Sequence, residues 1–534
     1  MGRATASQPP WQAASRSGLQ GRAGSVVARP NVRNAKQIRG TLAVAARRTT
    51  AHGAGATAEP RNICSTWLVA CDEPGPTRHG RVPTSPFTTT ALPEDTPPVD
   101  GTETTGDPST APYCPTQSPL RRGADLNGDG CDDLVVSAPY RHPIGAAYVF
   151  AGGTGDTFEP TFETTLEGTV DHEIFGAVLD IVGDLDADGF DDLAIANEQT
   201  TVLGEDRDEF VSLWFGAPDF TLGDPLELEE DSPGGVFGHG LAGVADADGD
   251  GVDDLLIGSL TGFVYTPGRA YLLSGQAGAF DGSVRTELLP LAADAGFGMT
   301  TAGAGDVDGD GLSDLLVGMT QFGDFEFDDG FVELFLGGAP FDGGSDQLLT
   351  GPFGFGSAMT AVGDWDGDGH DDVVIAAGYT VGGQGAAWLY TGAEDGLDPV
   401  PASEHTAEGS FGHAVAACSD IDGDDAPDVV IGGPFSEGTG AGHVAFGGDT
   451  ADLEPDMILT FPYGHKIGDS VGAFDANADG YGDVVLSGAG IYGDAPDVVL
   501  LYFGGPAFDD VPDTTLFAPD RDSEFGFGVI RGFH

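Results

Sequence analysis

Apolar and polar positions follow one repeating pattern along residues 125–534. In every repeat a short apolar run, rich in Val, Leu and Ile, comes directly after an aspartate-rich segment. The seven runs include residues 134–136, 193–195, 255–257, 315–317, 373–375, 429–431 and 484–486. Because these runs are uniformly apolar and do not alternate with polar residues, they predict buried central strands.

Three further strands are predicted in each repeat. A glycine-preceded apolar segment follows the central strand, as at residues 146–150 and 386–390, and an edge strand follows it, as at residues 286–289. A Phe-Gly pair then opens the next repeat, with Ile467-Gly468 as a degenerate version in the seventh. The pairs are Phe175-Gly176, Phe237-Gly238, Phe297-Gly298, Phe355-Gly356 and Phe411-Gly412.

The aspartate-rich segments are regularly spaced, 55 to 62 residues apart. They begin at Asp125, Asp184, Asp246, Asp306, Asp364, Asp420 and Asp475, and we number them loop 1 to loop 7. Four short strands repeated seven times at this period predict an all-β protein, a seven-bladed β-propeller of four-stranded blades. We assign the propeller to residues 121–534.

The first repeat lacks a Phe-Gly strand before its loop, and the chain carries one at its other end. Residues 525–530 read Phe-Gly-Phe-Gly-Val-Ile, similar to residues 353–356, and stop where an eighth loop would begin. We therefore expect this last strand to complete the first blade and to lock the two ends of the ring together.

The loops share one set of oxygen donors. Each has Asp or Asn at positions 1, 3 and 5 and Asp at position 9, and six have Gly at position 6, where a sharp bend is needed. With the backbone carbonyl of position 7, these groups form a flexible, highly charged oxygen cage that suits Ca²⁺ better than Mg²⁺. We predict up to seven Ca²⁺ ions. The predicted ligands are Asp125, Asn127, Asp129, Cys131 and Asp133; Asp184, Asp186, Asp188, Phe190 and Asp192; Asp246, Asp248, Asp250, Val252 and Asp254; Asp306, Asp308, Asp310, Leu312 and Asp314; Asp364, Asp366, Asp368, His370 and Asp372; Asp420, Asp422, Asp424, Ala426 and Asp428; Asp475, Asn477, Asp479, Tyr481 and Asp483.

The loops have two other interpretations, an EF-hand and a metal-free turn. An EF-hand needs Glu at position 12 and flanking helices, whereas Val136 and Ile195 stand there and strands follow. The loops could also be aspartate-rich turns that bind no metal. Loop 6 fits the calcium pattern least well, because Asp425 replaces the glycine and Pro427 stiffens the chain.

Charge restricts the partners. The chain holds 86 acidic residues against 21 Lys and Arg, a formal net charge of −65. Phosphate binding needs clustered cations, so we exclude nucleic acid as a partner. An anionic membrane surface would also repel the chain. High acidity also favours solubility, but that does not account for the spacing of the aspartates.

The N-terminal part differs from the repeats. Residues 1–61 contain ten basic residues and one acid, and we expect residues 1–71 to be a disordered or targeting region. The segment 68–71, Leu-Val-Ala-Cys, resembles a bacterial lipobox, which makes Cys71 a candidate lipid anchor. Residues 72–120 are rich in Pro and Thr and predict a linker. We therefore expect an extracellular or cell-surface location, as a secreted protein or lipoprotein.

Cysteine usage agrees with an oxidising compartment. The five cysteines are Cys64, Cys71, Cys114, Cys131 and Cys418. Cys114 and Cys131 are close enough in sequence to pair across the first blade, and the alternative is that all are free. Cys418 lies in an apolar run and is expected to be a buried thiol.

The Phe-Gly openings, the aspartate-rich loops and the segments that follow the central strands, such as Ser137-Ala138-Pro139 and Gly432-Gly433-Pro434, resemble FG-GAP repeats. FG-GAP repeats form the propeller of integrin α-subunits and occur in many bacterial surface proteins. The resemblance implies a seven-bladed propeller with calcium in hairpin loops on one face. This chain departs from the integrin pattern in carrying the loop in all seven repeats.

Two classes of function follow from this pattern. The first is an adhesion or ligand-recognition module, expected to be a monomer with a protein or glycan ligand, in which calcium is structural. The alternative is a propeller-based extracellular hydrolase or polysaccharide lyase, with His239, His370, His413 and His443 as candidate bases. Two of these histidines directly follow Phe-Gly pairs, and no nucleophile elbow, metal triad or Walker loop is present, so we predict no catalytic activity.

Overall fold

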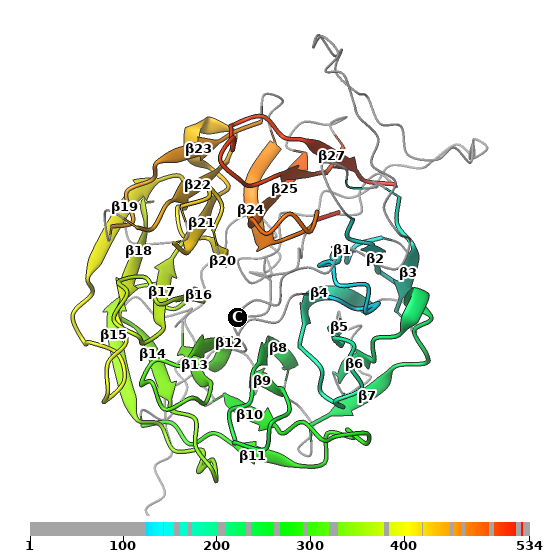
Figure 1. The fold of residues 1–534 in the computed structure, drawn as a ribbon, viewed down its shortest axis with the longest axis vertical. Coiled ribbons are helices and arrows are strands. Elements are labelled where there is room, and N and C mark those ends of the chain that lie inside the picture. The colour runs from blue at the N-terminus through cyan, green and yellow to red at the C-terminus, as the bar shows by residue number, and fades with distance from the viewer. Residues whose placement is uncertain are drawn as a thin grey trace, which may run out of the picture. The chain divides into compact units, whose positions relative to one another are not determined.

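The described strands of the computed structural model form seven antiparallel sheets that lie side by side around a ring (Figure 1). This confirms the predicted seven-bladed β-propeller. The structure describes residues 124–526 with the exception of residues 142–143, 154–157, 159–160, 169–172, 200–209, 231–235, 261–267, 292–295, 320–328, 379–383, 419, 425, 449–451, 462–464, 491–495 and 520–524.

Each blade corresponds to one sequence repeat. Blade 1 contains β1 (Leu134–Ala138), β2 (Ala146–Phe150) and β3 (Thr164–Glu167); blade 2 contains β4 (Glu173–Ile181), β5 (Leu193–Gln199), β6 (Phe210–Trp214) and β7 (Leu226–Glu229). Blade 3 contains β8 (Val236–Val244), β9 (Asp254–Leu260), β10 (Arg269–Leu273) and β11 (Arg285–Glu287); blade 4 contains β12 (Phe297–Gly305), β13 (Asp314–Met319), β14 (Asp329–Phe335) and β15 (Gln347–Pro352). Blade 5 contains β16 (Ala358–Gly363), β17 (Asp372–Ala377), β18 (Gln384–Tyr390) and β19 (Ser403–Glu408). Blade 6 contains β20 (Ala414–Cys418), β21 (Asp428–Gly433), β22 (Ala441–Ala445) and β23 (Met457–Leu459); blade 7 contains β24 (His465–Phe474), β25 (Asp483–Gly490), β26 (Val498–Tyr502) and β27 (Thr514–Phe517). Two 3-10 turns, η1 (Pro218–Phe220) and η2 (Ser436–Gly438), complete the assignment.

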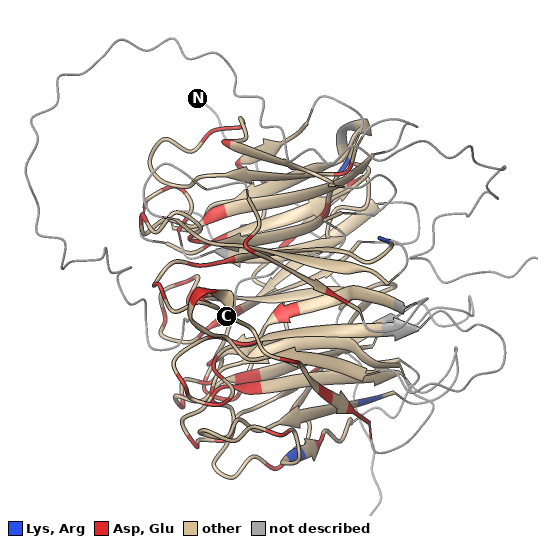
Figure 2. Cartoon of the chain, turned by 90° about the vertical axis from the view of Figure 1, so that its right-hand side faces the viewer, with Lys and Arg blue, Asp and Glu red and all other residues tan. Residues whose placement is uncertain are grey.

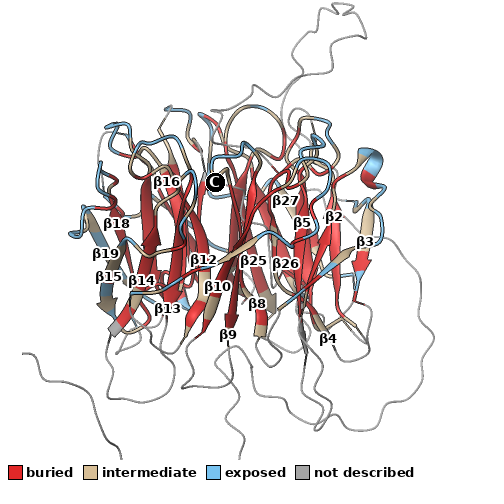
Figure 3. Cartoon of the chain, turned by 90° about the horizontal axis from the view of Figure 1, so that it is seen from below, coloured by how far each residue is buried: buried red, intermediate tan, exposed pale blue. Residues whose placement is uncertain are grey.

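Burial follows the order of strands within a blade. The second strand is buried along most of its length, as in β13, β17 and β21, because neighbouring blades cover both of its faces. The fourth strand lies at the rim and is the most exposed, and β19 alternates between intermediate and exposed residues (Figure 3). The uniformly apolar runs in the sequence are therefore the central strands, as predicted.

The blades are joined by apolar clusters that draw residues from two neighbours. Phe150 of blade 1, for example, shares a cluster with Val485 of blade 7. The phenylalanines of the Phe-Gly pairs are among the largest fully buried side chains, and the glycine that follows lets the backbone approach the previous blade. At Gly238, which has a φ of 94°, a Cβ would lie 2.7 Å from Val211 Cγ2. The Phe-Gly signature is thus a contact between blades.

The C-terminal Phe-Gly pair contacts the first blade in the same way. The amide of Gly526 donates to the carbonyl of Ser137 in β1, which matches the bond from Gly412 to Gly432 inside blade 6. Phe525 lies in the same apolar cluster as Phe150. These contacts agree with the prediction that residues 525–530 complete blade 1. Residues 527–530 lie outside the described part of the chain.

Several predictions fall on residues that the structure does not describe. The targeting region 1–71, the linker 72–120, and the cysteines Cys64, Cys71 and Cys114 all lie outside it, so the lipid anchor and the proposed pairing of Cys114 stay predictions. Cys131 is buried. The described part of the chain contains no helix with the length and hydropathy of a membrane span.

Candidate metal centres

The aspartate-rich loops gather on one side of the ring. In blades 2 to 7 each loop joins the innermost strand to the second strand, so antiparallel topology places all of them at the same end of the sheets. Asp and Glu are concentrated in the loops at this end, seen at the left in Figure 2. A dense negative field therefore covers one face.

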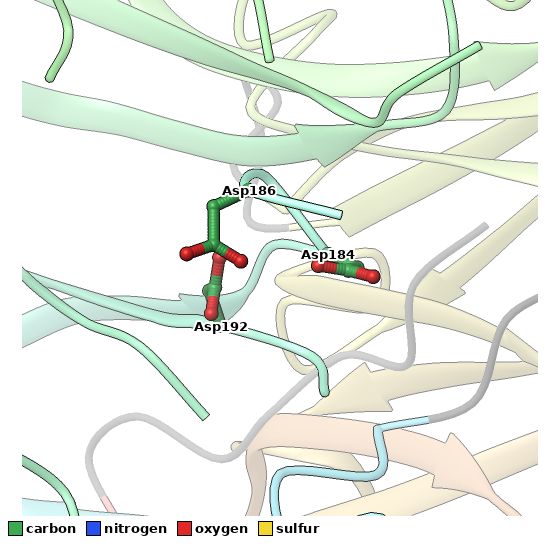
Figure 4. A group of neighbouring side chains, drawn as sticks. All are labelled: Asp184, Asp186 and Asp192. Carbon is green, nitrogen blue, oxygen red and sulfur yellow. The ribbon is translucent and has the colours of Figure 1, made fainter. Parts of the chain in front are cut away.

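Loop 2 shows how the side chains converge. Carboxylate oxygens of Asp184, Asp186 and Asp192 lie within 4.8 Å of one another, and Asp186 faces Asp192 (Figure 4). Oδ1 of Asp186 is buried and has no hydrogen-bond partner. Comparable groups occur in four more loops, formed by Asp246, Asp248 and Asp250; Asp306, Asp308 and Asp314; Asp364, Asp366 and Asp372; and Asp420, Asp422 and Asp428.

Position 1 organises the turn. In all seven loops one of its carboxylate oxygens accepts from the amide of position 5, as between Asp184 and Asp188 at 2.9 Å. Its other oxygen accepts from the position 6 glycine, as at Gly189, whose φ is 98°. An L side chain is strained in this conformation, which explains the glycine there. Residue 425, which breaks the pattern in loop 6, is not described.

Position 9 anchors each loop to its blade. All seven position 9 aspartates are fully buried. One oxygen accepts from the amide of position 2, as from Leu185 to Asp192 at 3.0 Å, and the other accepts from a glycine amide after the third strand, as from Gly216 at 3.0 Å. Burial, which outweighs these hydrogen bonds, raises the pKa of Asp192, Asp254 and Asp314 to about 8. A nearby cation would hold these carboxylates ionised.

The two loops with Asn at position 3 have the same geometry. The amide of Asp129 donates to Asn127 Oδ1 at 2.7 Å, and the amide of Asp479 donates to Asn477 Oδ1 at 3.0 Å. An Asn oxygen therefore replaces the carboxylate oxygen of the other loops in this bond. The side-chain amides of both residues donate to position 5, at Asp129 and Asp479.

Position 7 was predicted to contribute only a backbone carbonyl, and the structure gives its side chain a second contact. Phe190 of loop 2 packs on Gly128 of loop 1, and Tyr481 of loop 7 packs on Gly423 of loop 6. His370 packs on Gly309 of loop 4 in the same way. Position 7 side chains therefore cover the loop of the preceding blade.

Two residues that the sequence analysis missed also shape the loops. The glycine after each third strand approaches the position 8 carbonyl so closely that a Cβ on Gly216 would lie 2.3 Å from Asp191 O. Position 8 itself is Asp in four loops, at Asp132, Asp191, Asp253 and Asp371. The sequence shows a glycine after the third strand of every repeat and, in four loops, an aspartate before position 9. It does not show which residues they contact.

Three of the candidate catalytic histidines make defined contacts. His239 Nδ1 lies 2.9 Å from Met299 O on the next blade, and His413 Nε2 lies 3.4 Å from Asp469 Oδ1. His443 is buried against the ring of Phe411. Two of these contacts, those of His239 and His413, join neighbouring blades.

Models of known protein families match segments of this chain that contain the aspartate-rich loops. The family model for the FG-GAP repeat matches residues 123–150, and the model for the FG-GAP-like repeat matches residues 364–431. These segments contain loops 1, 5 and 6. The chain contains FG-GAP repeats. Its fold and its repeats resemble the N-terminal propeller of integrin α-subunits.

Relatives of this FG-GAP protein include integrin alpha-8 of Homo sapiens, 36% identical over 152 residues, which cover 26% of this chain and 14% of the integrin. Integrin alpha-V of Gallus gallus is 30% identical over 241 residues, 41% of this chain and 21% of that one. The chain thus matches only a small part of these relatives. Among solved structures, the BP39L lectin from Burkholderia pseudomallei aligns over 73% of this chain and 99% of that one, with 14% identity and a TM-score of 0.44, too low to support any inference.

Proposed function

We propose that this FG-GAP protein is a calcium-binding recognition module, exported from the cell or held at its surface, in which Ca²⁺ is structural. The observation that carries the proposal is the repeated convergence of aspartates illustrated by Asp184, Asp186 and Asp192. Only oxygen donors are present, the loops are built mainly on small residues, and the donor set is strongly anionic, which favours Ca²⁺.

The residues that would hold each ion are the side chains of positions 1, 3, 5 and 9 and the carbonyl of position 7. The donor set fits a cation, because the buried, unpartnered oxygen of Asp186 lacks a counter-charge and because burial raises the pKa of position 9 carboxyl groups such as Asp192. A bound ion supplies positive charge that cancels the repulsion between the carboxylates. Position 9 then ties the ion to the blade through its two backbone amide partners.

Recognition is the function that this scaffold supports best. The resemblance to integrin α-subunits supports an adhesion or ligand-binding role, with a protein or glycan as the partner. The net charge of −65 argues against nucleic acid. We also propose that the protein is a monomer. We propose that it is not an enzyme, since the candidate histidines are accounted for by packing and by contacts between blades.

Metal content and heat stability test the calcium proposal. The full chain, purified in calcium, is measured by native mass spectrometry and by thermal unfolding with and without a chelator. We expect up to seven bound ions and a lower melting temperature in chelator. Asp192→Asn should lose one ion, while Asp224→Asn, an exposed aspartate of the same blade, should lose none. Absence of bound calcium, or a melting temperature that a chelator does not change, would refute the proposal.

The recognition role needs a separate experiment. The calcium-loaded protein is screened against glycan and extracellular-protein arrays, and each hit is repeated in chelator. Binding that needs calcium supports a structural ion behind a recognition surface. A screen that finds turnover of a polysaccharide or ester substrate would instead favour the enzymatic alternative.

A further inference from the structure

The position 8 aspartates reach toward the preceding blade. In each of four pairs a position 8 carboxylate accepts a hydrogen bond from the backbone amide of position 1 in the neighbouring loop. The pairs are Asp191 with Asp125 at 2.9 Å, Asp253 with Asp184 at 3.0 Å, Asp371 with Asp306 at 2.9 Å, and Asp132 with Asp475 at 3.1 Å. The last pair joins loop 1 to loop 7 across the closure of the ring.

Two of these carboxylates are buried, and those of Asp132 and Asp371 are partly buried. Asp191 is 7% exposed and Asp253 is 4% exposed. The contact with the preceding loop is tight, since a Cβ on Gly183, directly before Asp184, would lie 2.6 Å from Asp253 Oδ2. When ionised, such a carboxylate accepts a stronger hydrogen bond than a neutral group does, and each pair then holds the backbone of position 1 firmly.

Backbone hydrogen bonds strengthen the contact between neighbouring loops. The amide of Asp191 donates to the carbonyl of Asp125 at 3.1 Å, so this pair of residues is held by both main chain and side chain. The next residue of loop 1, Leu126, accepts from the amide of Ala217 in blade 2 at 2.9 Å. Contacts with blade 2 therefore fix the backbone at the start of loop 1, where the first predicted calcium ligand lies.

We propose that the position 8 carboxylates are positioning residues for the first calcium ligand of the preceding loop, so that the calcium affinity of one loop depends on the next blade. The proposal rests on calcium binding as proposed above. Position 8 directly precedes the position 9 ligand, so an ion in loop 2 that holds Asp192 also fixes Asp191, and Asp191 orients Asp125. Occupancy is thus coupled between neighbours, through Asp191 for loops 2 and 1.

The coupling is not uniform around the ring. Position 8 is Ser313, Pro427 or Gly482 in loops 4, 6 and 7, where no carboxylate is available. The hydroxyl of Ser313 has no hydrogen-bond partner. Loops 3, 2, 1 and 7 therefore form one continuous coupled run through Asp253, Asp191 and Asp132, which crosses the point where the two ends of the chain meet. Loops 5 and 4 form a separate pair, and loops 4 and 3 share the backbone bond from the Ser313 amide to the Asp246 carbonyl without a carboxylate.

Hydrogen exchange measured by mass spectrometry in a calcium titration resolves the loops individually. The full chain and the Asp191→Ala variant are compared at peptides covering loop 1 and loop 2. We expect the calcium concentration for half-maximal protection of loop 1 to rise about tenfold, as for loss of one hydrogen bond to a charged group. Loop 2, which contains residue 191, should change much less. Asp191→Asn, which keeps an acceptor oxygen, should restore part of the affinity of loop 1.

Matched variants make the result decisive. Ser313→Ala alters the same position without removing a hydrogen bond and should leave loop 3 unchanged. Asp253→Ala repeats the test at loop 2 and serves if Asp191→Ala fails to fold. An effect of Asp191→Ala on loop 2 alone, or on neither loop, overturns the coupling while calcium binding stands. If the unaltered protein shows no calcium-dependent protection, both the coupling and the proposed function fail.

Discussion

The amide nitrogen of Gly526 donates a hydrogen bond to the carbonyl oxygen of Ser137 at 2.8 Å, which joins the end of the chain to its first central strand. Phe525, which is 1% exposed, packs beside Tyr148 in the same blade. Because a ring of blades without this contact has two free ends, the pair is expected to stabilise the whole propeller.

Phe525→Ala should therefore lower the free energy of unfolding by about 3–5 kcal/mol, the usual cost of emptying a buried phenylalanine site. Phe435→Ala is the matched control, because Phe435 is 49% exposed, and it should change stability by less than about 1 kcal/mol. Denaturant unfolding of the calcium-loaded protein measures both. Equal effects of the two substitutions would contradict a closing role for Phe525.

A second prediction concerns the glycine after the third strand. Gly216→Ala places a Cβ 2.3 Å from Asp191 O and 2.7 Å from Phe190 Cβ, where backbone would have to move. We expect a loss of about 2–3 kcal/mol in unfolding free energy. Gly223→Ala, with no atom within 4 Å of the new Cβ, should be close to neutral. If both variants unfold at the same denaturant concentration, the close approach at Gly216 does not constrain the blade.

A third prediction concerns the effect of pH on the metal-free protein. Burial raises the pKa of Asp192 and Asp254 to about 8 in the folded state, above the ordinary value of 3.8. The folded, metal-free protein therefore binds protons that the unfolded chain releases, and its stability falls as pH rises from about 4 to 8. Added calcium removes this penalty, so the stabilisation that calcium provides should grow between about pH 5 and pH 8. Thermal unfolding with calcium and with chelator across this range checks it, and a stabilisation that shrinks with pH would contradict it.

A fourth prediction rests on His443. Burial, with a smaller contribution from His405, lowers the pKa of His443 to about 4. The unfolded imidazole takes up a proton near its ordinary pKa of 6.5, so the stability due to this group is complete above that pH and is lost progressively toward pH 4. The loss should reach about 3 kcal/mol. His443→Leu lacks this contribution, so denaturant unfolding of the calcium-loaded variant should depend less on pH than that of the unaltered protein. Identical pH profiles would show that His443 is not a buried neutral group.

Much of this protein follows from its sequence. The blade count, the buried central strands and the convergence of positions 1, 3 and 9 in loops such as that of Asp184 were all predictable, because strand periodicity and short-range turn geometry are local properties. The preference for calcium depends on the donor atoms, which the residue types also give. Calcium binding stays a prediction.

Contacts between distant parts of the chain were decided by the tertiary structure. The sequence contains Asp191 and Gly216 as a residue before a ligand and a glycine after a strand, but it does not say that one holds Asp125 and that the other must pass close to Asp191 O. Likewise, the C-terminal Phe-Gly pair suggested closure, and only the fold identifies Ser137 as its partner. The reason is physical: these partners are separated by tens to hundreds of residues, so the packing of strands and blades, and no local pattern, brings them together.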